Sequence, residues 1–153
     1  KPFNKSIRLA YIGVPPIFTD FYEFFEKLDA DIFFNEVQRQ FSMPFIDNTL
    51  QDAKNKSDSD MELNPLLNQY LVFTYPYSVF DRITDISAEM SKRDIHGIIS
   101  YSQAFCHRQI DNILLKKYLP YPFLTVEGDT PDLLDERTKL RLESFLDMLR
   151  FAR

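Results

Sequence analysis

The sequence predicts an α/β domain with a doubly wound, four-stranded parallel sheet, Rossmann-like or flavodoxin-like, with helices on both faces. Short apolar runs alternate with segments whose apolar residues recur every three or four positions, which is typical of strands alternating with helices. The apolar runs are continuous, as expected for strands that are covered on both faces. We expect the strand order 2-1-3-4 and a single domain over residues 1–153.

The first part of the chain predicts a β-α-β unit. Residues 7–14 are β-branched and apolar and predict a strand, which Pro15 and Pro16 end. Residues 17–28 predict an amphipathic helix that buries four aromatic side chains, Phe18, Phe21, Phe24 and Phe25. Residues 31–37 predict the second strand. The unit is expected to be parallel and right-handed.

The remaining elements continue this alternation after an irregular middle segment. Polar residues 48–61 predict a loop or an exposed helical insertion. Helices are then expected at residues 63–73, 79–92 and 133–151, and strands at residues 97–102 and 122–126. One further helix is expected between these two strands. The final helix presents an apolar face formed by Leu142, Phe145, Leu146 and Leu149.

The predicted sheet also predicts where a ligand binds. Ligands of such sheets lie beyond the carboxyl ends of the strands, near the point where the strand order reverses. The segments expected at this edge are residues 13–16, 36–40, 101–106 and 127–129. Three of these four segments carry polar or ionisable side chains, so this edge is the expected site.

Cys106 is the only cysteine of the chain, and it lies at this edge. It follows the strand at residues 97–102 and stands at or just before a helix that carries Ile110, Ile113 and Leu114 on one face. Unpaired N–H groups and the dipole at a helix start favour a thiolate. A thiolate acts as a nucleophile, a redox group or a metal ligand, whereas most free cysteines are small buried hydrophobes. The residues alone leave these alternatives open.

Five other polar residues near this edge are weak candidates for substrate binding, namely Ser100, Gln103, Glu127, Asp129 and Arg39. Glu127 and Asp129 either hold a substrate group or a proton, or they have structural roles, with Asp129 capping a turn and Glu127 pairing with an arginine. Arg39 either binds an anion or closes a salt bridge.

Composition argues against several classes of function. A net charge of −5 with scattered basic residues predicts no nucleic-acid partner. Only three glycines are present, and no glycine-rich phosphate loop. No apolar run reaches the length of a membrane span, which predicts no membrane partner. One cysteine cannot form an internal disulfide, so we expect a reducing, cytoplasmic setting.

Two segments carry a resemblance to a known family. Residues 97–106 read Gly-Ile-Ile-Ser-Tyr-Ser-Gln-Ala-Phe-Cys, and residues 122–129 read Pro-Phe-Leu-Thr-Val-Glu-Gly-Asp. Together with residues 12–18, 34–44 and 135–149, they resemble the carboxyl-terminal half of 2-hydroxyacyl-CoA dehydratase subunits. This group includes 2-hydroxyglutaryl-CoA dehydratase and benzoyl-CoA reductase. The resemblance implies that the chain is the carboxyl-terminal part of a longer subunit.

The resemblance implies an oxygen-sensitive lyase of anaerobic metabolism that dehydrates a 2-hydroxyacyl-CoA to an enoyl-CoA. Its implied cofactor is a 4Fe–4S cluster held by cysteines, and Cys106 matches the ligand of the family's Phe-Cys motif. The implied partners are an acyl-CoA substrate, a sister dehydratase subunit and an ATP-dependent iron–sulfur activator. The activator donates one electron, which forms a ketyl radical that expels the 2-hydroxyl group.

The sequence departs from this family in its supply of ligands. A cluster takes several cysteines, and this chain has one. Family members have a further cysteine in the preceding domain, and many have one near the segment that here spans residues 75–78. We therefore expect the isolated domain to be inactive and to hold no stable cluster. The alternatives are a benzoyl-CoA-reductase-like or other low-potential reductase subunit, and a non-catalytic interaction domain of such a complex.

Overall fold

A computed structural model of the chain describes residues 6–42, 73–75 and 78–152. Its centre is one parallel sheet with the strand order β2-β1-β3-β4. The strands are β1 (Ile7–Gly13), β2 (Ala30–Asn35), β3 (Gly97–Gln103) and β4 (Phe123–Gly128). The predicted α/β class and the predicted order 2-1-3-4 are both confirmed.

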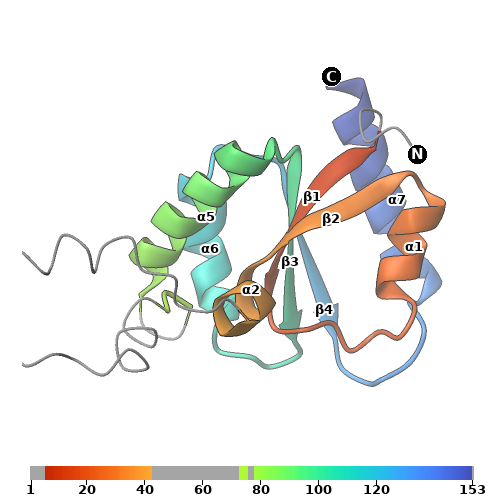
Figure 1. Ribbon diagram of the computed structural model, residues 1–153. Helices are drawn as coiled ribbons and strands as arrows, with labels where there is room; N and C mark the ends of the chain where they lie inside the picture. Colours follow the sequence, from red (N-terminus) through yellow and green to blue (C-terminus); the bar gives the residue numbers. More distant parts are fainter. Residues whose placement is uncertain (1–5, 43–72, 76–77, 153) are drawn as a thin grey trace, which may run out of the picture.

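Helices cover both faces of the sheet (Figure 1). Helices α1 (Phe21–Lys27) and α7 (Glu136–Phe151) lie on one face, and α5 (Val79–Arg93) and α6 (Gln109–Tyr118) lie on the other. The short helix α2 (Glu36–Ser42) follows β2 directly at the carboxyl edge of the sheet. The arrangement is doubly wound, as predicted.

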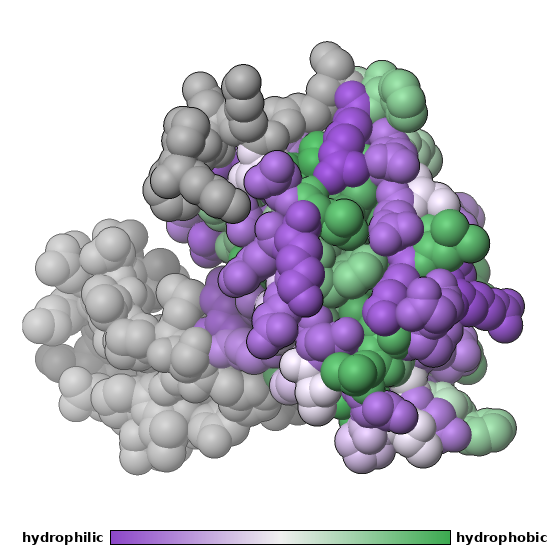
Figure 2. All heavy atoms as spheres, turned by 90° about the vertical axis from the view of Figure 1, so that its right-hand side faces the viewer, coloured by the Kyte–Doolittle hydropathy of each residue, from purple (hydrophilic) through white to green (hydrophobic). Residues whose placement is uncertain are grey.

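The alternation of side chains along β1 separates two hydrophobic cores. Leu9 and Tyr11 are buried against α1 and α7, whereas Ala10 and Ile12 are buried toward α5 and α6. The predicted apolar face of α7 is confirmed, and so is the predicted burial of Phe21 and Phe25, whereas Phe18 and Phe24 are half-buried and pack against the same core. The outer surface on the α1 and α7 side is largely hydrophilic, with apolar residues in separate patches (Figure 2).

Helix α1 is shorter than predicted. The spacing predicts a helix from residue 17, but α1 begins at Phe21. The backbone before Phe21 forms hydrogen bonds with distant parts of the chain. Ile17 N–H donates to the Tyr101 hydroxyl (3.3 Å), and Thr19 N–H donates to the Asp132 carbonyl (3.1 Å). These contacts hold the segment against β3 and the connection between β4 and α7 instead of in a helical turn.

The second strand ends earlier than predicted, at Asn35, and α2 begins at Glu36. The chain turns here because the Glu36 carboxylate accepts a hydrogen bond from Gly13 N–H (3.1 Å) and pairs with Arg82. The predicted loop at residues 48–61 and nearly all of the predicted helix at residues 63–73 lie outside the described residues; Phe73 is buried and not helical.

Helix α6 has a different orientation from the one its sequence suggests. It begins at Gln109, and the predicted apolar face is largely in solvent, with Ile110 and Ile113 exposed by 68% and 69%. Leu115 and Leu119 are the buried residues instead, and they join the core beneath α5. No helix among the described residues combines the length and apolar character of a membrane span.

Candidate functional site

A cavity of about 50 Å³ lies at the carboxyl edge of the sheet, between the ends of β1 and β3. This is the point where the strand order reverses, because β1 is followed in the sheet by β2 on one side and by β3 on the other. Ligands of doubly wound sheets bind at such a point. Among the residues that line the cavity are Gly13, Ser100, Ser102 and Cys106. The cavity therefore lies where the sequence predicts the site.

Cys106 lies in the loop between β3 and α6, and its side chain is half-buried against this cavity. Its N–H donates to the carbonyl of Gln103 (3.1 Å), and its own carbonyl accepts from Gln109 N–H (3.1 Å). These two bonds join the end of β3 to the first residue of α6. The thiol therefore stands three residues before Gln109, in a turn that leads into the helix, close to its predicted place at the helix start.

Phe105, which precedes the thiol, has an unusual backbone conformation. Its φ angle is 62°, and its side chain is 100% exposed. The left-handed region is costly for a bulky side chain, and such strain is concentrated at functional sites. The conformation leaves the ring of Phe105 in solvent while the next side chain, Cys106, lines the cavity.

Two serines of β3 contribute hydroxyl groups to the cavity. Ser100 and Ser102 are two residues apart and therefore share one face of the strand. The Ser100 hydroxyl donates to Asn112 Oδ1 at 2.7 Å. Ser102 is only 6% exposed, and its hydroxyl has no hydrogen-bond partner within the part of the chain that the structure describes. Buried hydroxyl groups without a partner are rare in native proteins.

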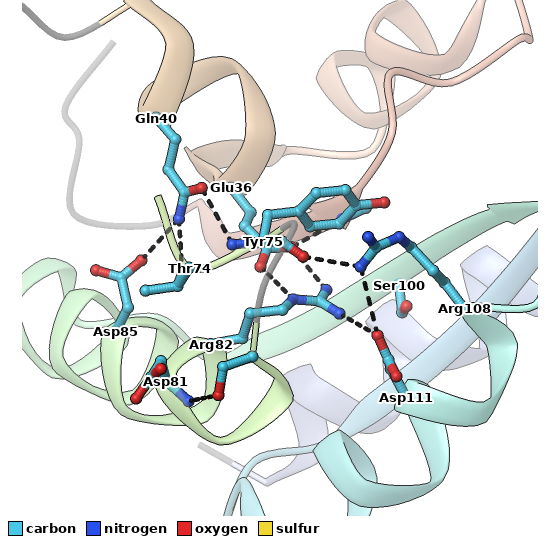
Figure 3. Close-up of polar contacts among 12 residues, drawn as sticks. Glu36, Gln40, Thr74, Tyr75, Asp81, Arg82, Asp85, Ser100, Arg108 and Asp111 are labelled. Atoms are coloured by element: carbon cyan, nitrogen blue, oxygen red, sulfur yellow. Dashed lines mark hydrogen bonds and ion pairs between the residues drawn. The ribbon is translucent and has the colours of Figure 1, made fainter. Parts of the chain in front are cut away.

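Arg82 lines the cavity and belongs to a buried ion pair (Figure 3). Arg82 of α5 and Glu36 of α2 are 3% and 0% exposed, and they form two parallel bonds, Nε–Oε1 at 2.8 Å and Nη2–Oε2 at 2.9 Å. Burial lowers the pKa of Arg82, but the hydrogen bond and the charge of Glu36 raise it, and the net direction is upward. The guanidinium therefore stays protonated, and the pair fixes α5 to the end of β2.

Tyr75 connects this ion pair to the loop of Cys106. Arg82 and Arg108 both contact its ring, with Cζ 4.6 and 4.7 Å from the ring centre. Arg108 also donates to the Tyr75 carbonyl (2.8 Å), and Arg82 donates to Asp111 of α6 (3.1 Å). Burial raises the pKa of the Tyr75 hydroxyl, although both guanidinium groups act in the opposite direction. These contacts hold α5 and the start of α6 together (Figure 3).

The structure brings some of the predicted candidates together and separates others. Ser100, Gln103 and Cys106 line the cavity. Glu127 is exposed, pairs in register with Ser102 and does not line the cavity; neither does Asp129, which is exposed just after β4.

Arg39 lies apart from the cavity, on α2. Its guanidinium forms a salt bridge with Asp85 and approaches Glu89 at 3.8 Å. Of the two roles expected for Arg39, the salt bridge is the one that the structure contains.

Sequence reasoning overlooked Arg82 and Asp111 and did not single out Glu36 within its predicted edge segment. A signal for Arg82 was present, because it stands four residues before Ile86 and eight before Met90, both of which are buried. A charged residue on the apolar face of a helix requires a buried partner. The identity of that partner depends on a contact between residues 46 positions apart in the sequence.

The residues present fit one ligand position of a 4Fe–4S cluster and not a complete set. Such clusters are held by about four cysteine thiolates, and this chain offers the single thiol of Cys106. Within the described ranges, no group of three or more His, Cys, Asp and Glu side chains is placed to hold a metal. The cavity is open to one further atom or small group beside the thiol rather than to a whole cluster.

Comparison with known families gives a match over nearly the whole chain. The model of the family "2-hydroxyglutaryl-CoA dehydratase, D-component" matches residues 1–149. No curated protein matches the sequence. The family comprises 2-hydroxyacyl-CoA dehydratases, which are lyases, and it typically carries iron–sulfur clusters. Because the match covers nearly the whole chain, this protein belongs to the 2-hydroxyglutaryl-CoA dehydratase D-component family.

Proposed function

We propose that the chain is the carboxyl-terminal domain of a 2-hydroxyacyl-CoA dehydratase-like lyase, in which Cys106 supplies one thiolate ligand to a 4Fe–4S cluster. The observation that carries this proposal is the place of Cys106, at the cavity between the carboxyl ends of β1 and β3. The reaction removes water from a 2-hydroxyacyl-CoA and gives an enoyl-CoA. Its partners are a sister subunit and an ATP-dependent iron–sulfur activator, in the reducing cytoplasm.

The backbone around Cys106 favours this role. The loop is fixed at both ends by the hydrogen bonds to Gln103 and from Gln109, so the thiol has a defined direction before any ligand binds. The strained Phe105 separates it from β3. Preorganisation of this kind is what a metal ligand needs, because a ligand that must first be ordered loses affinity.

The charged network has a scaffolding role in this proposal. Glu36 and Asp111 balance Arg82 and Arg108, and each of these groups has its partner within the network. Charges that are already paired contribute little to substrate binding. In this proposal substrate contacts come instead from Gln103, at the cavity, and from Glu127 and Asp129, two exposed carboxylates at the end of β4.

Iron content tests the ligand role most simply. The complete gene product is reconstituted anaerobically as wild type, as Cys106→Ala and as His107→Ala, an exposed neighbour that serves as the matched control. We expect Cys106→Ala to lose cluster iron and 2-hydroxyacyl-CoA dehydration, and His107→Ala to keep both. Unchanged iron and activity in Cys106→Ala would refute the role. The isolated chain is expected to bind no stable cluster.

The single cysteine favours a second candidate, a non-catalytic interaction domain of such a complex. The exposed apolar side chains of Phe105, Ile110 and Ile113, close to Cys106 in the sequence, fit this function. In that case Cys106→Ala leaves the activity of the assembled complex unchanged.

A third possibility is a reductase of the same family. Its product distinguishes it, because a reductase forms a reduced acyl-CoA instead of an enoyl-CoA.

A further inference from the structure

We propose that Cys106 is a site of reversible oxidation. Hydrogen peroxide converts its thiol to a sulfenic acid, and the added oxygen lies in the cavity and accepts a hydrogen bond from the Ser102 hydroxyl. The reaction takes place in the chain without bound metal, so it goes beyond the proposed function and does not depend on it. In this state the cavity holds one oxygen atom of a modified cysteine.

The first observation is a hydroxyl group without a partner at the cavity of the thiol. Ser102 is 6% exposed, and its Oγ has no hydrogen-bond partner among the described residues. A buried hydroxyl without a partner lowers the stability of the folded chain. Ser102 and Cys106 line the same cavity. An acceptor atom that is bonded to the sulfur and points into the cavity can therefore satisfy this hydroxyl.

The second observation is the size of the cavity. Its volume of about 50 Å³ exceeds the roughly 10–15 Å³ that one water molecule needs. The cavity therefore has room for the two oxygen atoms of hydrogen peroxide, and after the reaction for the oxygen on sulfur and the released water. Gln103 and Asn112 also line it, and their amide groups suit such polar occupants. A bulky oxidant does not fit within this volume.

The third observation concerns the fate of the sulfenic acid. A sulfenic acid condenses with a second thiol to form a disulfide. Cys106 is the only cysteine of the chain, so the chain contains no thiol for this reaction. The side chain is half-buried, and hydrogen bonds with Gln103 and Gln109 fix its loop at both ends. The modified sulfur is therefore held at the cavity, where the approach of another chain is restricted.

The reaction balances with peroxide as the oxidant. The sulfur attacks one peroxide oxygen, an S–O bond forms and the O–O bond breaks. The thiol proton and the leaving hydroxide combine to give water, so the sulfur loses two electrons and the peroxide gains them. A thiol reductant reverses the oxidation. While the oxygen is present, the sulfur offers no thiolate to a metal, and only this consequence rests on the proposed ligand role of Cys106.

Ser100 provides a matched control for Ser102. It lies on the same face of β3 and lines the same cavity, yet its hydroxyl donates to Asn112 at 2.7 Å. Its hydrogen bond is thus already made inside the protein. We expect Ser102, and not Ser100, to stabilise the oxygen on Cys106.

The test uses the purified chain, freed of metal by a chelator, as wild type, Cys106→Ser, Ser102→Ala and Ser100→Ala. Each protein is treated with hydrogen peroxide, and dimedone, which traps sulfenic acids, is added after increasing times. Mass spectrometry measures the yield and the lifetime of the sulfenic acid. We expect wild type to form a sulfenic acid at Cys106 that dithiothreitol reverses, and Cys106→Ser to form none. Without the hydrogen bond, Ser102→Ala should lose the sulfenic acid to further oxidation roughly two- to tenfold faster, whereas Ser100→Ala should match wild type.

Three results of this experiment overturn the inference. They are the absence of a dimedone adduct at Cys106 of the folded wild type, equal lifetimes in wild type and Ser102→Ala, and an equal lifetime in wild type that has been unfolded in urea. The last result would show that the fold contributes nothing to the persistence of the sulfenic acid.

Crystals of the wild-type chain soaked in peroxide give a second readout, which does not require Ser102→Ala to fold. We expect one oxygen atom bonded to Sγ of Cys106 and within hydrogen-bonding distance of Oγ of Ser102. An oxygen atom that points into solvent instead overturns the inference. The iron content of Cys106→Ala tests the proposed function separately, because the oxidation is measured in the absence of metal.

Discussion

Arg82 and Glu36 form a bidentate ion pair that is fully enclosed by the protein, and the same carboxylate accepts the N–H of Gly13 at the end of β1. The pair therefore joins α5, the start of α2 and β1 at the edge of the candidate site. Its effect is architectural, because it determines how closely the helices approach the strand ends that form the cavity.

Removal of one partner of this pair is expected to destabilise the folded chain strongly. Glu36→Gln removes the buried counter-charge of the Arg82 guanidinium and leaves only the half-buried carboxylate of Asp111, so we expect a loss of about 3 kcal/mol in the free energy of unfolding. Urea unfolding of the purified chain measures this loss. Asp147→Ala, which breaks the exposed pair with Arg150, is the control, with an expected loss of at most about 1 kcal/mol.

A double variant of the pair completes this test. Glu36→Gln combined with Arg82→Met removes both charges, so it is expected to cost less than the two single changes added together. If Glu36→Gln and Asp147→Ala lowered the free energy of unfolding equally, the buried pair would not have the structural importance that we assign to it.

Gly13 cannot carry a side chain. Its φ angle is +101°, and an added Cβ would lie 2.1 Å from the backbone carbonyl oxygen of Tyr101. We expect Gly13→Ala to cost more than about 3 kcal/mol or to prevent folding. Gly97→Ala, where the nearest atom is 2.8 Å away in the flexible side chain of Leu149, is expected to cost clearly less. Thermal unfolding compares the two, and the reverse order would contradict this account of β1 and β3.

Asp135 caps α7 and makes the stability of that helix depend on pH. Its side chain accepts from Thr138 N–H (2.9 Å) and from the Thr138 hydroxyl (2.7 Å), and these bonds lower the pKa of Asp135. A lowered pKa in the folded state means that the stabilisation is present above the ordinary value of about 3.9 and is lost as the pH falls through the folded value.

Replacement of this cap gives a direct measurement. Asp135→Ala is expected to lose about 1 kcal/mol at neutral pH, and Asp135→Asn is expected to retain most of the cap. The difference in the free energy of unfolding between wild type and Asp135→Asn should narrow as the pH falls below the ordinary carboxyl pKa and through the lowered pKa of the folded state. Unfolding in urea measures this difference. If it stayed constant between pH 3 and 7, the charge of Asp135 would not be the source of the stabilisation.

Tyr75 is expected to matter through its ring rather than its hydroxyl. Two guanidinium groups, those of Arg82 and Arg108, contact the ring. Tyr75→Phe keeps both contacts and should stay within about 0.5 kcal/mol of wild type, whereas Tyr75→Leu should lose about 1–2 kcal/mol. Hydrogen exchange of the Cys106 loop should rise in the leucine variant only. Equal behaviour of the two variants would show that the ring does not hold the loop.

Much of the fold was predictable because its signals are local. The run from Ile7 to Gly13 and the run beginning at Gly97 are rich in apolar residues, and such runs occur in strands that are covered on both faces. The alternation with helices then implies parallel pairing and places Cys106 at the carboxyl edge. The position of the site thus followed from topology, without knowledge of any side-chain contact.

The remaining features depend on contacts that a local pattern does not contain. Ile110 and Ile113 look like a buried face, but α6 is oriented by Leu115 and Leu119 beneath α5. The unsatisfied hydroxyl of Ser102 is equally invisible in the sequence, where it cannot be distinguished from Ser100. Burial and pairing of polar groups are decided by the packing of distant elements.

The central claim is that the Cys106 thiolate binds iron, and anomalous diffraction tests it most directly. Crystals of the complete gene product are grown anaerobically, and data are collected on both sides of the iron absorption edge. The account predicts an anomalous iron peak at bonding distance from Sγ of Cys106. Iron peaks elsewhere in the protein, with the Cys106 thiol unligated and no iron next to it, would contradict the claim.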